Sequence, residues 1–133
     1  MTRSSFLASF LSVGLGAAIG AWLRWFLGLM LNPLFVTLPL GTLTANLIGA
    51  YLIGIAIGVF HIHSGLPPAL KLFVITGFLG GLTTFSSFAA EVLERLLAQQ
   101  TFWALSAVAL HVLGSLFFAW LGLLSVGAGK VFS

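Results

Sequence analysis

The chain contains no cysteine, and charged residues make up only 5% of its 133 residues. The absence of cysteine excludes disulfide bonds, thiolate nucleophiles and thiolate metal sites. The scarcity of charge separates the sequence from soluble domains, in which about a quarter of the residues are charged. The five basic and two acidic residues are scattered along the chain, so we expect no nucleic-acid partner.

Long apolar runs occupy most of the sequence, and hydrophobic residues account for 60% of it. A bilayer core about 30 Å thick requires roughly 20 apolar residues per helix. These runs predict an all-α membrane protein with four transmembrane helices, in a single four-helix domain over residues 1–133. We place the helices at about residues 6–30, 43–60, 69–97 and 102–126.

Prolines mark the connections between the first runs. The first run ends before Pro33 and the second before Pro67, because proline cannot continue a helix from the preceding turn. An alternative for the first run is a cleavable signal peptide, since Arg3 precedes it. The run is longer than the apolar part of a signal peptide and carries Arg24 near its end, as a membrane-interface anchor does. We therefore interpret it as a helix.

The basic residues are divided almost evenly between the two sides of the predicted helices. Four spans put both termini on one side, with Arg3, Lys71 and Lys130, while Arg24 and Arg95 lie on the other. Three against two is a weak positive-inside bias. The balance favours insertion in both orientations and pairing of two copies as an antiparallel homodimer. A single fixed orientation is the alternative.

The third run is interrupted near its middle by small and hydroxylated residues. Gly80 and Gly81 precede Thr83 and Thr84, and such a sequence can unwind a helix at membrane depth. Irregular backbone is tolerated there when it is buried in protein or lines a cavity, and its freed carbonyl oxygens suit a small hard cation such as Na⁺. A glycine kink satisfied by Ser and Thr hydroxyls is the alternative.

Polar side chains also recur on the predicted second and fourth helices. Thr42, Asn46 and Ala50 share one helical face, and so do His111 and Ser115. An amide in hydrocarbon is costly unless it is hydrogen-bonded, so Asn46 should face a partner helix, a cavity or a permeating species. Hydrogen bonding between helices is the default interpretation for both sets.

Two phenylalanines and a carboxylate share a face after the predicted break. Phe85, Phe88 and Glu91 follow at intervals of three, and the positive edges of two aromatic rings can replace part of the hydration of a small anion. Core packing is the usual role of such a pair. For Glu91 we expect an ordinary surface ion pair with Arg95. Arg24 either points toward protein or snorkels to the interface.

The residues that catalysis requires are not grouped in this sequence. No carboxylate pair flanks a polar pocket, and no Ser, His and Asp set is indicated. His61 and His63 lack the further ligands of a zinc site, and no glycine-rich phosphate loop follows a strand. We expect neither an enzyme nor nucleotide-coupled transport.

Four segments taken together resemble the Fluc (CrcB-type) family of bacterial fluoride channels. They are residues 16–24 (GAAIGAWLR), 41–49 (GTLTANLIG), 77–88 (GFLGGLTTFSSF) and 111–115 (HVLGS). The resemblance covers all four predicted spans. It implies a fluoride-selective channel in the bacterial inner membrane, built as an antiparallel, dual-topology homodimer, that exports fluoride passively and lowers its cytoplasmic concentration.

The resemblance also implies roles for particular positions. Gly80 and Thr83 match residues whose backbone carbonyls, from both subunits, hold a structural Na⁺ that is not transported. The positions that match the fluoride pathway are Asn46, Phe85, Phe88, Ser115, Thr42 and Ser86. The positions that match the vestibules are Arg24 and Glu91.

A small four-span, proton-coupled multidrug transporter is the alternative function. It shares the size and the dual topology expected here, but it requires a carboxylate embedded in its first span. Both acidic residues of this chain, Glu91 and Glu94, lie at the end of the third run. The sequence therefore favours the channel.

The near balance of basic residues predicts both orientations in one membrane. Because the chain has no cysteine, Ser133→Cys supplies a single thiol reporter at the C-terminus. A membrane-impermeant maleimide applied to sealed vesicles should label roughly half of the protein, as expected where the positive-inside bias is weak. Labelling from one side only would exclude dual topology.

Overall fold

The computed structural model describes residues 2–127, 130 and 132–133. It is built from helices, and four helical segments are long and apolar enough to cross a membrane: Arg3–Leu34, Leu40–Ile62, Pro68–Leu97 and Thr101–Ser125. The four predicted apolar helices are thus confirmed. The first and second begin three residues before the predicted bounds, and for the first helix the reason is a cap: the Thr2 side chain accepts a hydrogen bond from the Ser5 amide.

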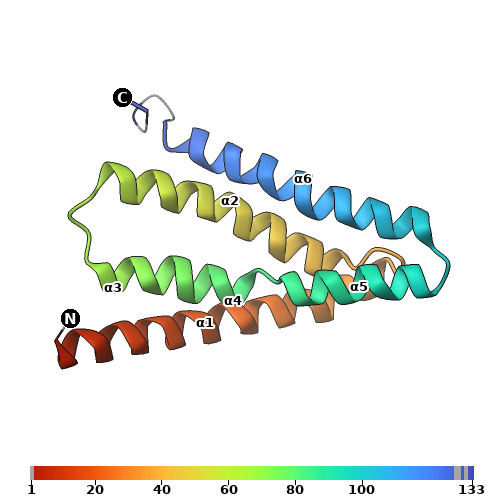
Figure 1. The fold of residues 1–133 in the computed structure, drawn as a ribbon, viewed down its shortest axis with the longest axis horizontal. Coiled ribbons are helices and arrows are strands. Elements are labelled where there is room, and N and C mark those ends of the chain that lie inside the picture. The colour runs from red at the N-terminus through yellow and green to blue at the C-terminus, as the bar shows by residue number, and fades with distance from the viewer. Residues whose placement is uncertain (1, 128–129, 131) are drawn as a thin grey trace.

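The segments divide into shorter elements along the chain. The first comprises α1 (Arg3–Leu31) and η1 (Asn32–Leu34), and the second is α2 (Leu40–Ile62). The third comprises α3 (Pro68–Lys71), η2 (Leu72–Leu79), α4 (Gly80–Leu82) and α5 (Phe85–Leu97), and the fourth is α6 (Thr101–Ser125). The two ends of the chain lie at the same end of the bundle (Figure 1), as an even number of crossings requires.

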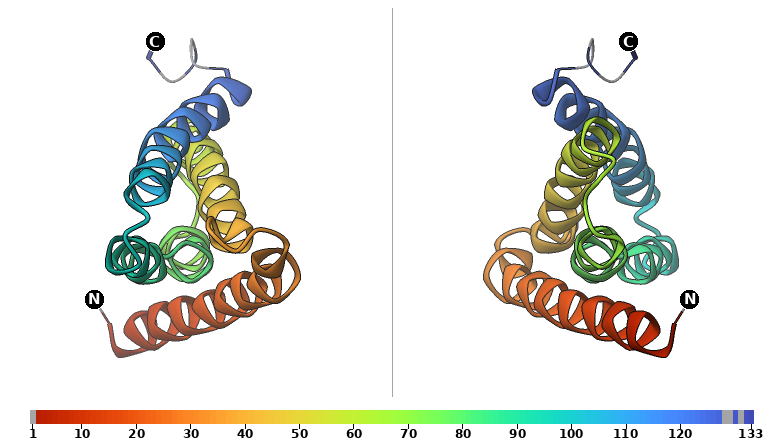
Figure 2. Two further views of the ribbon diagram at one scale, coloured as in Figure 1. Left: turned by 90° about the vertical axis from the view of Figure 1, so that its right-hand side faces the viewer. Right: turned by 90° about the vertical axis from the view of Figure 1, so that its left-hand side faces the viewer.

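The third segment lies between α1 and the pair formed by α2 and α6. The end-on views of Figure 2 show this order, and the contacts agree, because α2 packs mainly on α6 whereas α1 packs on η2 and α4. Both packings are close at glycines. A Cβ atom on Gly54 would overlap the Ala119 carbonyl of α6, and one on Gly20 would overlap the Phe78 carbonyl of η2. Small residues bring backbones into contact where lipid provides no hydrophobic driving force.

The third segment is broken in the middle, as the sequence predicted, although not at its glycines. Gly80 and Gly81 are helical, and the extended residues are Thr83 (ψ 153°) and Thr84 (ψ 122°). Gly81 instead allows close packing against α1, because a Cβ there would lie 3.0 Å from the Ala17 Cα atom. The helix restarts at Phe85, where the Thr84 side chain accepts a hydrogen bond from the Ser87 amide.

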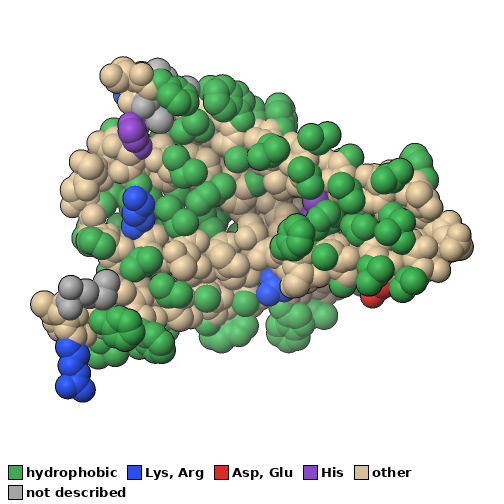
Figure 3. Space-filling model, in the orientation of Figure 1, with side chains coloured by type: hydrophobic (Ala, Val, Ile, Leu, Met, Phe, Trp, Pro, Cys, Tyr) green, Lys and Arg blue, Asp and Glu red, His purple; other side chains and the backbone are tan. Residues whose placement is uncertain are grey.

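Large apolar side chains lie mainly on the outside of the bundle. Hydrophobic side chains cover much of the face shown in Figure 3, while Ala45 and Leu82 in the interior are fully buried. An interior of small residues with an apolar exterior is what a bilayer solvent favours. The surface of the bundle therefore agrees with the membrane assignment made from the sequence.

The turn between α5 and α6 contains a strained residue, which leads to a stability prediction. Gln99 has φ 60°, a left-handed conformation that costs an L-residue about 1 kcal/mol or more and that glycine adopts freely. Gln99→Gly should raise the midpoint of thermal unfolding of the purified protein. Ala98→Gly, at φ −81°, is the matched control and should lower it. A lower midpoint for Gln99→Gly would contradict the assignment of strain.

Candidate functional site

Asn46 of α2 joins the two sides of the break in the third segment. Its Oδ1 atom accepts a hydrogen bond from the Thr84 amide at 2.7 Å, and its Nδ2 atom donates to the Thr84 carbonyl at 3.0 Å. Because the backbone amide can only donate, the orientation of the Asn46 side chain is determined. The Asn46 side-chain amide, which is costly in hydrocarbon without hydrogen bonds, thus pairs with the extended backbone at Thr84. That backbone would otherwise lack partners.

His111 of α6 extends this hydrogen-bond network. The second proton of Asn46 Nδ2 is directed to His111 Nδ1 at 2.9 Å, so Nδ1 accepts and a neutral ring carries its proton on Nε2. The ring is only 4% exposed, and no partner within the described residues reaches Nε2. The default interpretation of His111, a hydrogen bond between helices, is therefore confirmed for one nitrogen, while the other is a buried donor.

Phe85 and Phe88 meet edge to face beside this network. Their ring centroids are 5.6 Å apart with an interplanar angle of 68°, and the Phe88 ring lies 4.7 Å from the ring of His111. An open cavity of about 240 Å³ lies here, lined by Asn46, Thr83, Thr84, Phe85, Phe88, His111, Val112 and Ser115. Four of the predicted pathway residues thus line one cavity, and no charged residue is among its described walls.

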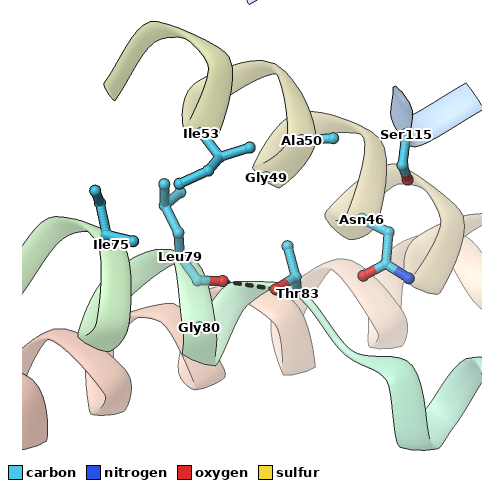
Figure 4. Close-up of a pocket in the computed structure, with 9 residues that line it drawn as sticks. All are labelled: Asn46, Gly49, Ala50, Ile53, Ile75, Leu79, Gly80, Thr83 and Ser115. Atoms are coloured by element: carbon cyan, nitrogen blue, oxygen red, sulfur yellow. Dashed lines mark hydrogen bonds between the residues drawn. The ribbon is translucent and has the colours of Figure 1, made fainter. Parts of the chain in front are cut away.

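A second cavity, of about 320 Å³, lies on the other side of Asn46 between α2 and the third segment. Figure 4 shows Asn46 and Ser115 toward one end of it, with Gly80 and Thr83 along its floor. Asn46, Thr83 and Ser115 line both cavities. The remaining walls are apolar or small, so polar groups concentrate where the helix is broken.

Several of the carbonyl groups at the break already have donors. The Leu79 carbonyl accepts from the Thr83 amide at 3.0 Å and from the Thr83 hydroxyl at 2.8 Å. The Gly81 carbonyl accepts from Arg24 Nε at 3.0 Å. The Arg24 side chain therefore points toward protein, the first of the two alternatives. The suggestion that hydroxyls satisfy the break is right for the Leu79 carbonyl and, on the other side of the break, for the Ser87 amide, which donates to the Thr84 hydroxyl.

The carbonyls of Gly80 and Thr83 differ from these. Within the described part of the chain no hydrogen-bond donor is directed at either of them. The reason at Gly80 is geometric, because the Thr84 amide that would continue the helix is turned to Asn46. Unpaired carbonyl oxygens of residues that line a cavity are suitable ligands for a small hard cation. These are the two positions predicted for Na⁺, and their chemistry fits that ion.

Thr42 of α2 and Glu91 of α5 are joined by a hydrogen bond. The Thr42 hydroxyl donates to Glu91 Oε1 at 2.5 Å, and Thr42 is only 6% exposed. The expected surface pair of Glu91 with Arg95 is wrong, because Arg95 instead donates to Gln100 at 2.7 Å. Thr42 and Glu91 line a polar cavity of about 300 Å³ that also includes Arg24.

Comparison with known proteins shows the family to which the chain belongs. The family model described as CrcB-like protein, Camphor Resistance (CrcB), matches residues 11–123. The chain belongs to the CrcB family. A relative named fluoride-specific ion channel FluC, from Dechloromonas aromatica, is 62% identical and covers 94% of this chain and 93% of its own. A second of the same name, from Nitrosospira multiformis, is 58% identical and covers 86% and 90%.

Membership of the CrcB family decides two of the expectations. The chain is a multi-pass membrane protein, and it is not an enzyme. The multidrug transporter has no support from these matches. The resemblance recognised from the four sequence segments is confirmed, and the matched region contains all of them.

The structure separates two neighbouring serines of this CrcB protein. Ser86 is exposed and lies 3.4 Å from the Thr84 hydroxyl, outside the lining of the three polar cavities. Ser87, for which the sequence predicted no role, lines the cavity with Arg24 and Glu91. Its helical spacing from Glu91 was the available signal, because residues four apart share a face.

Loss of the Asn46 amide should destabilise the break. Asn46→Asp places a second oxygen against the Thr84 carbonyl and removes the donor to His111, so we expect a loss of about 1–3 kcal/mol in unfolding free energy. Ser106→Ala is a control, since its exposed hydroxyl bonds only to the Phe102 carbonyl of its own helix. The free energy of unfolding in detergent is measured for both variants. Equal stability of the two variants would contradict the role of Asn46 in holding the break.

Proposed function

We propose that the chain is a fluoride-selective ion channel of the bacterial inner membrane that exports fluoride passively and lowers its cytoplasmic concentration. Two relatives named fluoride-specific ion channel FluC are 62% and 58% identical to this chain over most of its length. The structural observation that carries the proposal is the cavity beside the break, which is lined by an edge-to-face phenylalanine pair, an amide and hydroxyl groups.

The chemistry of this cavity suits a small, strongly hydrated anion. Such an ion leaves water only where compact donors replace its hydration, and Ser115 and the ring edges of Phe85 and Phe88 can do so. A full positive charge there would hold fluoride too tightly for conduction. Arg24 is half-buried and bonded to the Gly81 carbonyl, and it lines the separate cavity with Glu91. In our proposal these two groups form the vestibule.

Asn46 and Thr42 contribute to the pathway through the hydrogen bonds that they make to other residues. Both protons of Asn46 Nδ2 are engaged, so Asn46 holds the wall of the pathway and keeps the break open. The Thr42 hydroxyl is bonded to Glu91, at the vestibule. Ser86 is exposed next to Thr84, and we place it on the side of the pathway that a second subunit would complete.

An antiparallel homodimer would complete the site. One chain leaves the Phe85 ring 78% exposed and Gly80 exposed, although both belong to the polar region of the protein. A Cβ on Gly80 would meet nothing closer than the Ile75 carbonyl at 3.7 Å, unlike the glycines packed within the chain. A twofold axis beside Gly80 would bring together the same residues of two copies.

The two copies would together hold a structural Na⁺. A single chain offers the unpaired carbonyls of Gly80 and Thr83, and a symmetric partner would offer the same pair. Bound there, the ion would neutralise the carbonyl dipoles and lend positive potential to the neighbouring fluoride pathways without moving through the channel. The partners of the chain are then a second copy, fluoride and the lipid bilayer.

The proposal predicts selective fluoride release from liposomes. Purified protein should release fluoride but not chloride, followed with ion-selective electrodes. Phe85→Ile should reduce the fluoride rate by about tenfold or more, because it removes ring edges that replace hydration, a loss of at least about 1.4 kcal/mol at the barrier. Phe117→Ile is the control, since Phe117 is 58% exposed on α6 and lines none of the polar cavities. Equal chloride release, or no release of fluoride, would overturn the channel assignment.

A further inference from the structure

The first turn of α2 is held by a residue from the preceding segment. Pro39 stands at the N-cap position and provides no side-chain hydrogen bond. Asn32 of η1 supplies the missing acceptor, because its Oδ1 atom accepts from the Gly41 amide at 2.8 Å and from the Thr42 amide at 3.2 Å. The first amides of a helix have no partner within it, and in a membrane an unpaired amide is costly.

The Asn32 side chain has little freedom in this position. It lies between two glycines, since a Cβ on Gly41 would be 2.7 Å from Asn32 Oδ1 and 2.6 Å from the Gly28 Cα atom. A Cβ on Gly28 would in turn be 3.3 Å from Asn32 Nδ2. The end of α1 therefore packs closely on the start of α2 at these two glycines, and the Asn32 amide lies beside both of them.

Thr42 connects this cap to the charged end of the polar region. Its backbone amide is bonded to Asn32, and its hydroxyl is bonded to Glu91 Oε1 at 2.5 Å. The other carboxylate oxygen of Glu91 is buried and has no partner in the described part of the chain. All three residues line the cavity that contains Arg24. The direction of the Thr42 hydroxyl depends on the backbone that Asn32 holds.

We infer that Asn32 is a positioning residue, which orients the Thr42 hydroxyl so that it holds the Glu91 carboxylate at the wall of the vestibule cavity. The inference rests on the proposed channel function for its consequence on flux, although not for its geometry. Without the cap the first turn of α2 loosens and Thr42 releases Glu91. The freed carboxylate then turns into the cavity, where its negative charge opposes an entering anion.

A double-mutant cycle tests whether Asn32 acts through Thr42. Asn32→Ala should lower the rate of fluoride release about fivefold to tenfold, because the freed Glu91 carboxylate opposes the entering anion. In a Thr42→Val background the same change should have less than about a twofold effect, because residues acting through one contact are not additive. Thr2→Ala removes the cap of α1, the bond to the Ser5 amide, and should leave the rate unchanged.

A measurement that does not depend on flux tests the cap itself. Hydrogen exchange of the Gly41 and Thr42 amides should be about tenfold faster in Asn32→Ala. Asn32→Asp keeps an acceptor in the same place, so it should retain slow exchange. Unchanged exchange in Asn32→Ala would overturn the inference, and so would fully additive effects on flux. If the unmodified chain released no fluoride, the proposed function would fail. The exchange experiment would still show whether Asn32 holds the Thr42 amide.

Discussion

The hydrogen bonds between Asn46 and Thr84 are the interaction on which the rest of the polar region depends. A helix broken inside a bilayer exposes peptide groups that water cannot reach, and each unpaired group costs free energy. Asn46 satisfies both the amide and the carbonyl of Thr84 with one side chain. By turning the Thr84 amide away from the helix it also leaves the Gly80 carbonyl unpaired, so the stabilisation of the break and the proposed cation site have one origin.

Charge is distributed unevenly along the polar region, and this distribution supports conduction of an anion. The cavity beside Phe88 is lined by neutral groups, whereas Arg24 and Glu91 line a separate cavity near one end of the bundle. Both charges are restrained, Arg24 by the Gly81 carbonyl and Glu91 by the Thr42 hydroxyl. In the proposed channel an anion would meet charge at the vestibule and weaker neutral donors further in, which would allow it both to enter and to leave.

The sequence predicted those features that depend on interactions between residues close together in the chain. Four helices follow from apolar runs of bilayer length, and a break follows from a cluster of small and hydroxylated residues. The position of the break was less predictable. The sequence predicted the break within the stretch that contains both the glycine pair and the two threonines, and it did not single out one residue. In the structure Gly81 remains helical and packs against α1, and the chain opens at Thr83 and Thr84. Which glycine serves packing and which residue unwinds depends on the neighbouring helix.

The sequence by itself therefore determined the class, the helices and the residue types available for an ion pathway, and the family resemblance rested on the same local motifs. Only the tertiary structure decided the partners. Asn46 bonds to Thr84, Glu91 bonds to Thr42 and not to Arg95, and Asn32 caps the start of α2. Helical spacing shows which side chains share a face, but the partner across an interface is set by how the helices pack, and backbone contacts between distant segments leave no periodic signal in the sequence.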